Sequence, residues 1–299
     1  MRILKTFAAL GAIVLALALA ACTSATSPAT STVSFNLTDA PVDASKISNV
    51  YVSFGALAIN ESATAADTAT SWITVPIDST KRYDLLALSG GANALLGNVP
   101  LTAGTQVNQI RFTNPTVSIV ETANPGVELP CTLNSASLKI VNAFSVPLTG
   151  SLSLTVDFDV GKSLVYTQGT GYKMKPVLRA VIDNEAGKIL GTFAATTNPS
   201  HSYAVYVYKS GTYTDAETLP NADGAYFANA ITSAIPKAVS TGGFGYTLAF
   251  LEAGTYDLAI YDTTAASVVS APTSVSPTPT YTGVTVLSAK DTTENISLP

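Results

Sequence analysis

Short runs in which hydrophobic and polar residues alternate recur along most of the chain. Residues 33–38 run Val-Ser-Phe-Asn-Leu-Thr, and residues 152–160 begin with Leu, Leu, Val and Phe at every second position. A period of two is typical of a strand with one buried face. Similar runs predict strands at residues 50–59, 72–77, 106–113, 117–120, 138–141 and 177–183, and residues 83–88 are predicted as a short helical turn that ends before Gly90.

After residues 185–187 a second series of short strands begins. It is predicted at residues 189–195, 203–208, 226–231, 246–251, 256–261, 284–287 and 296–298, with a hairpin that turns at Gly254. Seven short strands in about 110 residues is the rhythm of an immunoglobulin-like or prealbumin-like sandwich. The pattern therefore predicts an all-β protein with two tandem antiparallel β-sandwich domains, at residues 33–185 and 186–299.

The N-terminus has a different pattern. Arg2 and Lys5 precede a run of apolar and small residues, 7–21, that is shorter than the ~20 apolar residues of a membrane-spanning helix. A positive region, an apolar core and small residues before a cut site are typical of a secretory signal. Residues 19–22, Leu-Ala-Ala-Cys, resemble the bacterial lipobox, which implies removal of residues 1–21 and acylation of Cys22. The alternatives are an ordinary signal peptide with an incidental cysteine, or an uncleaved anchor.

Acylation would make Cys22 the point of attachment to a membrane. Two or three acyl chains hold a protein firmly, whereas one chain binds reversibly. Residues 23–32 contain only Thr, Ser, Ala and Pro, which predicts a flexible tether. Thr23, in place of Asp, resembles the enteric sorting signal for the outer membrane. The sequence thus predicts a lipoprotein of the cell envelope, anchored at the outer membrane on its periplasmic or surface face.

Charge narrows the range of partners. The chain has 15 Lys and Arg against 20 Asp and Glu, and loss of the first 21 residues would leave 13 cations and a net charge of −7. Nucleic-acid binding rests on Lys and Arg that neutralise phosphates, so an acidic chain argues against it. The same balance argues against electrostatic adhesion to anionic lipids. The predicted partners are the membrane, through the lipid, and a protein or glycan that the sequence leaves unidentified.

Side chains suited to catalysis are scarce. With Cys22 acylated, Cys131 has no disulfide partner, and a single His cannot complete a zinc site of Cys and His ligands. We expect Cys131 to be a small buried residue at a strand edge. His201 lies in a loop sequence, and the chain has no Gly-x-Ser-x-Gly motif. These observations predict a protein that is not an enzyme and has no certain cofactor; the alternative is a hydrolase of envelope polymers.

Several motifs together resemble a known family. Residues 35–41 (Phe-Asn-Leu-Thr-Asp-Ala-Pro), 50–52, 83–88, 103–104, 108–111, 157–160, 162–163 and 171–177 resemble, in that order, the motifs of the DUF4382 domain. The resemblance covers about residues 33–183 and implies an envelope lipoprotein of Bacteroidetes-like or proteobacterial type. It implies no activity, because the family is named for having none established. The second half resembles prealbumin-like or carboxypeptidase-regulatory-like sandwiches in a general way.

Four aspartates form the best candidate site. Asp157 and Asp159 are two residues apart on a predicted strand, and Asp39 and Asp43 flank the predicted turn after the first strand. If these two strands end at the same edge of the sandwich, the carboxylates converge. Ca²⁺ is bound by six to eight oxygen ligands of this kind, so the sequence predicts a possible calcium site.

A purely structural role for these aspartates is the alternative. Asp39 before Ala-Pro is a turn former that bonds its own backbone, and Asp159 suits a turn cap. The cations expected to pair with the carboxylates are Lys162, Lys175, Arg111 and Arg179.

Aromatic residues suggest a further surface. Tyr206 and Tyr208 lie on one strand face, and exposed aromatic rows can stack sugars or peptides. Tyrosine is also common on half-buried sheet surfaces, which is the structural alternative. We predict a non-catalytic binding or structural module of the cell envelope, with a calcium-stabilised adhesion or carbohydrate-binding module as the alternative.

Overall fold

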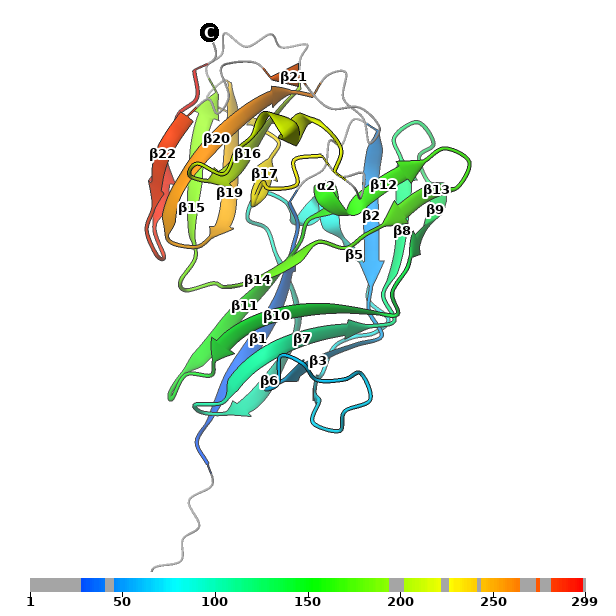
Figure 1. The fold of residues 1–299 in the computed structure, drawn as a ribbon, viewed down its shortest axis with the longest axis vertical. Helices are drawn as coiled ribbons and strands as arrows, with labels where there is room; N and C mark the ends of the chain where they lie inside the picture. Colours follow the sequence, from blue (N-terminus) through cyan, green and yellow to red (C-terminus); the bar gives the residue numbers. More distant parts are fainter. Residues whose placement is uncertain are drawn as a thin grey trace, which may run out of the picture.

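The computed structural model describes residues 28–40, 46–193, 202–221, 226–240, 243–263, 273–274 and 281–297. Nearly all of its regular elements are strands, which confirms the predicted all-β class (Figure 1). The predicted signal peptide, Cys22, residues 23–27 of the predicted tether, Asp43 and His201 lie outside the described residues. Among the described residues, no helix is both long and apolar enough to cross a membrane.

Three sheets form the half of the molecule that contains residues 30–182. The first sheet has the strand order β14 (Leu178–Ile182), β11 (Ser151–Phe158), β1 (Thr30–Thr38), β6 (Ala94–Thr102). The second has the order β10 (Ser137–Ser145), β7 (Gln106–Thr113), β3 (Ala56–Asn60), β4 (Ile73–Val75). The third has the order β12 (Leu164–Thr167), β13 (Gly171–Met174), β9 (Glu128–Leu133), β8 (Thr116–Glu121), β2 (Ile47–Ser53), β5 (Tyr83–Asp84).

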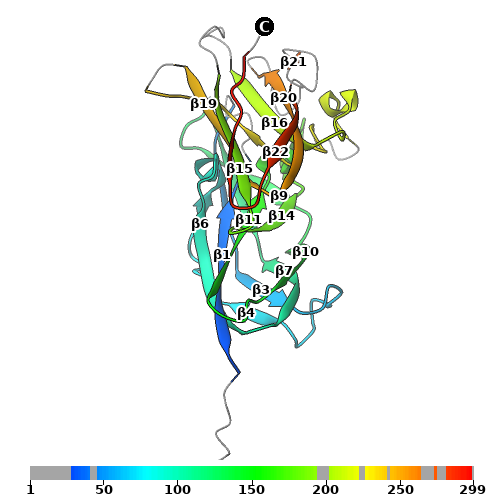
Figure 2. The same ribbon diagram turned by 90° about the vertical axis from the view of Figure 1, so that its left-hand side faces the viewer.

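The pairing of β1 with β11 is parallel, which departs from the purely antiparallel sheets that the sequence predicts. Their register runs from Thr32 opposite Ser151 to Thr38 opposite Asp157, and β1 pairs antiparallel with β6 on its other side. Parallel strands run in the same direction, so β1 and β11 end at the same edge of their sheet. Figure 2 shows β6, β1 and β11 on one side of this half, with β7 and β3 on the other.

Two sheets form the half that contains residues 187–296. One has the strand order β18 (Lys237–Ala238), β19 (Phe244–Leu251), β15 (Gly187–Phe193), β23 (Asp291–Thr293). The other has the order β17 (Thr232–Ala234), β16 (Tyr203–Lys209), β20 (Gly254–Asp262), β21 (Thr273–Ser274), with β22 (Tyr281–Val286) also paired to β20.

The predicted hairpin at Gly254 is wrong. β19 pairs with β15 and β18, whereas β20 pairs with strands of the other sheet, so the chain crosses between sheets at this point. Phe250 stands at the crossing with a positive φ of 55°. The strand predicted at residues 226–231 is wrong too, because β17 begins only at Thr232.

Each half has a hydrophobic core of its own. The larger core draws its buried residues from Val33 to Ala180 and includes Phe35, which meets Phe144 edge to face. The cores of the second half draw theirs from Ile189 to Ile296. The domain limits at residues 185 and 186 stay a prediction; β1 itself begins at Thr30, three residues earlier than expected.

Within the described ranges, three single-turn helices connect strands. They are η1 (Leu85–Leu88), α2 (Val160–Ser163) and η2 (Asp215–Thr218). The predicted turn at residues 83–88 is confirmed, since η1 follows β5 directly. α2 directly follows β11 and lies where the two halves meet (Figure 1).

Candidate functional site

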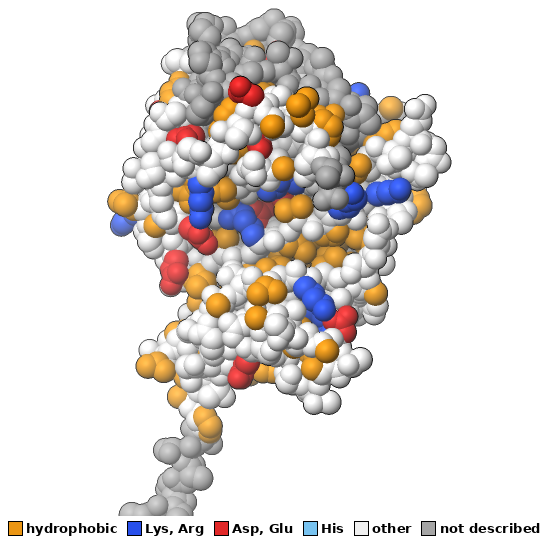
Figure 3. All heavy atoms as spheres, in the orientation of Figure 1, with side chains coloured by type: hydrophobic (Ala, Val, Ile, Leu, Met, Phe, Trp, Pro, Cys, Tyr) orange, Lys and Arg blue, Asp and Glu red, His pale blue; other side chains and the backbone are white. Residues whose placement is uncertain are grey.

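Three of the four predicted aspartates lie together where β1 and β11 end. Asp39 follows β1, Asp157 lies on β11, and Asp159 is the N-cap of α2. All three are buried, with exposed fractions of 5%, 2% and 7%. The common edge of the two parallel strands is what brings them together, and charged side chains gather at this level of the molecule in the space-filling view (Figure 3).

Asp157 forms an ion pair with Arg179 on the neighbouring strand β14. Asp157 Oδ2 accepts a hydrogen bond from Arg179 Nε at 2.9 Å, and Arg179 Nη2 lies 2.7 Å from the same oxygen. Arg179 Nη1 also donates to the backbone carbonyl of Phe250, at 2.6 Å. Because Phe250 belongs to β19, this pair joins the two halves of the molecule.

Asp159 forms a second pair that reaches the other half in the same way. Its Oδ1 accepts from the backbone N–H of Lys162 at 2.9 Å, and its Oδ2 lies 2.9 Å from Lys162 Nζ. Lys162 Nζ donates to the backbone carbonyl of Ala230 at 2.7 Å. The structural alternatives for Asp159, a turn cap and a pair with Lys162, are both confirmed.

Asp39 ties two distant parts of the first half together. Its Oδ1 accepts from the backbone N–H of Val160 at 3.0 Å. The turn that Asp39 is expected to bond continues into residues 41–45, outside the described residues, so that expectation stays a prediction. Burial raises the pKa of Asp39 well above its usual range, and the nearby charges of Asp157 and Asp159 add to the effect. Asp39 therefore holds a proton under conditions in which an exposed aspartate would have lost it.

Two oxygens of this cluster have no hydrogen-bond partner. Asp39 Oδ2 and Asp157 Oδ1 are buried and unpaired within the described residues. The described part of the chain holds no group of three or more Asp, Glu, His or Cys side chains that could bind a metal ion. Because Asp43 lies outside this part, the predicted calcium site at Asp39, Asp43, Asp157 and Asp159 stays a prediction.

Arg111 is not part of this junction, contrary to expectation. Its guanidinium stacks over the ring of Trp72 at 4.0 Å and lies 3.4 Å from Asp67 Oδ1. Lys139 forms an ion pair with the same Asp67 oxygen. This loop cluster of Asp67, Arg111 and Lys139 lies on the outer face of the second sheet. Arg111 and Lys139 are paired on β7 and β10, and their strand neighbours Phe112 and Ile140 are the ones buried in the core.

The predicted aromatic row is largely covered. Tyr206 and Tyr208 share one face of β16, but Tyr208 is fully buried and Tyr206 stacks on Phe227 at 3.9 Å. Tyr208 therefore forms no part of an exposed platform, and the structural alternative of a tyrosine covered on the sheet holds at this residue. The loop residues after β16, which carry Phe227, lie over this face of the sheet.

Cys131 is a buried residue of strand β9, as expected. Burial raises the pKa of its thiol to about 12. A thiol with so high a pKa is almost wholly protonated near neutral pH, and the thiolate is the nucleophilic form. Cys131 therefore has a packing role.

Sequence reasoning missed the partners in the second half. The cations Lys162 and Arg179 were expected, whereas the acceptors that they reach are the backbone carbonyls of Ala230 and Phe250. Every residue has such a carbonyl, so no side-chain signal marks it. The arrangement can hold the two halves in a fixed orientation, because each buried carboxylate positions a cation that bonds the opposite half.

Comparison with known proteins identifies one of the halves. Residues 30–176 match the family DUF4382, described as a domain of unknown function, and no curated protein matches the chain. Weak structural similarities exist to a leucine-rich repeat protein from Bacteroides thetaiotaomicron VPI-5482 (13% identity, 90% of this chain and 26% of that chain, TM-score 0.21). A second is to a putative cell adhesion protein from Bacteroides fragilis NCTC 9343 (11% identity, 83% of this chain and 80% of that chain, TM-score 0.20). A third is to BcpA, the major pilin subunit of Bacillus cereus (11% identity, 90% of this chain and 70% of that chain, TM-score 0.19).

This chain spans about a quarter of the length of the leucine-rich repeat protein, which it covers to 26%. All three TM-scores are too low to support an argument about function. Function has to be argued from the residues of this chain.

Proposed function

From the premise that this chain contains a DUF4382 domain at residues 30–176, we propose that it is a non-catalytic binding or structural module of the cell envelope. A lipid on Cys22 anchors it to the membrane, and the half formed by residues 187–297 is held away from the bilayer. The observation that carries the proposal is the use of the buried acidic side chains: each ion-paired carboxylate fixes a cation that bonds the opposite half.

The state of the titratable groups supports a non-catalytic role. General acid–base catalysis needs a group that reaches substrate with a pKa near the working pH. Asp157 and Asp159 are almost fully buried and paired with Arg179 and Lys162, so neither carboxylate is exposed to a substrate from solution. The thiol of Cys131 is buried and held protonated.

The direction of β1 supports the proposed orientation. The start of β1 lies at the end of the first half opposite the sheets of the second half (Figures 1 and 2). Seven residues, 23–29, lie between Cys22 and Thr30, and the eight residue steps from one to the other span at most about 28 Å when fully extended. Anchoring at Cys22 would keep the start of β1 near the membrane and present the second half to its surroundings.

The location that we propose is the outer membrane, and the partner is a protein or glycan reached from the displayed half. The sorting argument rests on Thr23 after Cys22. The charge balance of the chain supports a partner other than nucleic acid.

The two cysteines give a direct test of the anchor. We expect an alkyne analogue of palmitate to label the natural chain and the Cys131→Ala variant equally, and to leave Cys22→Ala unlabelled. The Cys22→Ala protein should leave the membrane fraction. Labelling that persists in Cys22→Ala, or a natural chain without label in the soluble fraction, would refute lipid anchoring.

The hydrolase alternative is tested on a panel of glycosides, esters and peptides with the purified full chain. We expect no turnover. Turnover that Asp157→Asn or Asp159→Asn abolishes, while the exposed control Asp67→Asn retains it, would contradict the proposed function.

A second candidate function is a calcium-stabilised module, and the two unpaired buried oxygens of Asp39 and Asp157 favour it. A ligand that binds only the native state raises the melting temperature. Calcium binding predicts a higher melting temperature in millimolar Ca²⁺ than in chelator. Equal melting temperatures would exclude this candidate.

A further inference from the structure

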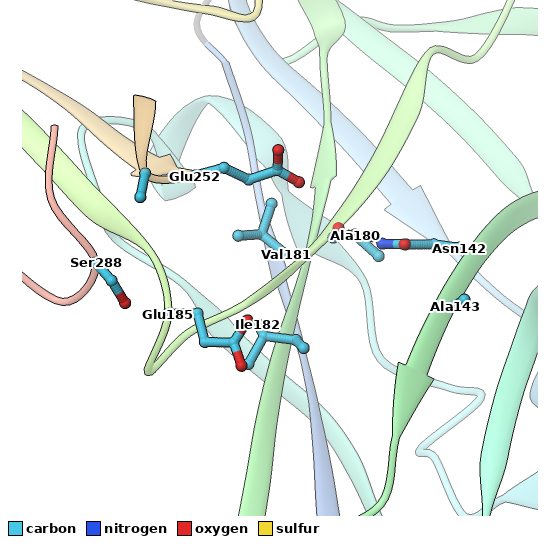
Figure 4. A pocket seen from close by; sticks show the side chains of 9 residues that line it. Asn142, Ala143, Ala180, Val181, Ile182, Glu185, Glu252 and Ser288 are labelled. Carbon is cyan, nitrogen blue, oxygen red and sulfur yellow. Dashed lines mark hydrogen bonds between the residues drawn. The ribbon is translucent and has the colours of Figure 1, made fainter. Parts of the chain in front are cut away.

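A groove of about 530 Å³ runs between the two halves, beside β14. Its volume falls in the range of about 300–1,000 Å³ that ligand pockets occupy. One side is formed by Ala180 and Ile182 of β14 and by Asn142 of β10, and the other by Glu252 and Ser288 of the second half. Figure 4 shows Glu252 and Glu185 on the two sides of the strand that carries Ala180 and Val181, with Asn142 beside Ala180.

β14 is the edge strand of its sheet, and its outer edge faces this groove. The backbone bonds from Asp159 N to Val177 O and from Asp183 N to Ser153 O fix which residues bond to β11. In an antiparallel pair, the residues between bonded pairs turn their N–H and C=O groups outward. Ala180 and Ile182 are such residues, so their backbone groups point away from β11 and toward the groove.

Part of this edge is already occupied. The carbonyl of Ala180 accepts from Asn142 Nδ2 at 2.6 Å, and the carbonyl of Ile182 accepts from the turn at Glu185 and Ala186. No bond from the outward N–H groups of Ala180 and Ile182 is found within the described residues. Two donors on alternate residues of an edge strand are the groups that an added strand uses.

β10 contributes an irregular edge to the same groove. Its register with β7 shifts between Val141 and Phe144, so Asn142 and the following alanine lie in a bulge. A bulge leaves residues outside the regular ladder, which resumes here at Phe144 opposite Val107. The first half therefore lines the groove with two strand edges, those of β14 and β10. Each edge has backbone groups that do not take part in a regular strand ladder.

The charges at the groove are mainly negative. Glu185 and Glu252 are exposed at its rim. Lys209 Nζ lies 3.9 Å from Glu252 Oε2, but both side chains are about two-thirds exposed, at 65% and 68%. Such an exposed pair is weak and easily exchanged. A cationic group in the groove would meet two carboxylates.

We propose that this groove binds an extended peptide segment that carries lysine or arginine. The segment adds as a short strand at the edge of β14, accepts hydrogen bonds from the N–H groups of Ala180 and Ile182, and places its cations against Glu185 and Glu252. The inference deepens the proposed function, because it names the partner of the binding module as a basic peptide of extended conformation. Its failure would leave the lipid anchor untouched.

The test uses the full chain and fluorescently labelled hexapeptides. One probe alternates Val with Lys, and a second alternates Val with Glu. A third has the Val-Lys sequence with trans-alkene bonds in place of its amides, which keeps the extended shape and removes the carbonyl acceptors. We expect the Val-Lys probe to bind at least about tenfold more tightly than the Val-Glu probe, because the rim carboxylates attract one and repel the other. The alkene probe should lose binding, because it has no carbonyl oxygens to accept from the N–H groups of Ala180 and Ile182.

Variants separate the groove from general surface charge. The double substitution Glu185→Gln with Glu252→Gln should weaken the Val-Lys probe about tenfold and reduce its salt dependence. The control Glu61→Gln removes one exposed acid from a loop of the other sheet and should leave binding unchanged. Thermal melts check that each variant is folded.

Hydrogen exchange supplies a readout that needs no variant. Addition of the Val-Lys probe should slow exchange at the amides of Ala180 and Ile182. Equal binding of the two charged probes, equal binding to the double variant and the control, or unchanged exchange at these amides would overturn the proposal. A dimer that forms without peptide and is lost in the double variant would overturn it in favour of a second copy of this chain.

Discussion

In the described part of the chain, two clusters bring aspartates together with both a lysine and an arginine, and the two clusters differ in burial. At the junction, the side chain of Asp157 is 3% exposed, whereas that of Asp67 in the loop cluster is 56% exposed. Hydrogen bonding to Lys139 lowers the pKa of Asp67, while burial raises the pKa of Asp39 at the junction. Similar side chains thus hold the two halves together at the buried junction, whereas in the loop cluster they form exposed ion pairs on the surface.

The largest expected effect comes from breaking the junction at Arg179. The substitution Arg179→Met leaves Asp157 buried without its cation and removes the bond to Phe250, so we expect the free energy of unfolding to fall by about 3–5 kcal/mol. Urea unfolding followed by Trp72 fluorescence and by circular dichroism measures it. The double variant Asp157→Asn with Arg179→Met should recover part of the loss, because no buried charge remains. If Arg179→Met were as stable as the natural chain, the buried ion pair would not hold the two halves together.

Lys162 should matter less than Arg179. The substitution Lys162→Met removes the ion pair and the bond to Ala230, but Asp159 keeps the hydrogen bond from the backbone N–H of residue 162. We expect a loss of about 2 kcal/mol, the size of a hydrogen bond to a charged group. The same urea experiment applies, and a loss larger than that of Arg179→Met would reverse the proposed order.

Substitution of Asp39 should raise the free energy of unfolding, in contrast to the substitutions of Arg179 and Lys162. Its raised pKa means that the folded protein keeps a proton that the unfolded chain releases, so stability falls as pH rises from the ordinary value of 3.8 toward the folded pKa. The substitution Asp39→Asn removes this dependence and keeps an acceptor for Val160, so we expect a gain of about 1 kcal/mol at neutral pH. Melting temperatures of both proteins from pH 4 to 8 measure the two slopes. If the melting temperatures of the two proteins changed equally with pH, Asp39 would not carry the proton in the folded state.

The loop cluster should give the smallest effect. Asp67→Asn and Lys139→Met each remove an exposed ion pair, which contributes little to stability because water and salt screen it. We expect melting temperatures equal to that of the natural chain. A fall as large as that of Lys162→Met would show that exposure does not separate the two clusters.

Local pattern predicts much of this fold. The alternation at residues 33–38 and the run from 152 predict β1 and β11, and residues 106–113 coincide with β7. The strand predicted at residues 50–59 is divided into β2 and β3, because Phe54 and Gly55 lie between them. β6 was missed because Gly97 and Pro100 interrupt its pattern; a Cβ on Gly97 would lie 2.0 Å from the carbonyl oxygen of Pro76.

Long-range features account for what the sequence did not predict. The crossing after β19 depends on which sheet receives β20, and local turn residues carry no information about that choice. In the candidate site, too, the local contact was predicted and the long-range contact was not. Asp159 and Lys162 are three residues apart and their pair was foreseen, whereas Asp39 meets Val160 across 121 residues.

The parallel pairing of β1 with β11 also sets an order of assembly. A loop of more than a hundred residues must close before these strands meet, and closing so long a loop lowers the chain's entropy before any contact compensates for it. β1 can pair with β6 much earlier, since fewer residues separate them. During synthesis, β1 can therefore pair with β6 first. The ion pairs of the junction can form only after Phe158 and the residues beyond it have emerged from the ribosome.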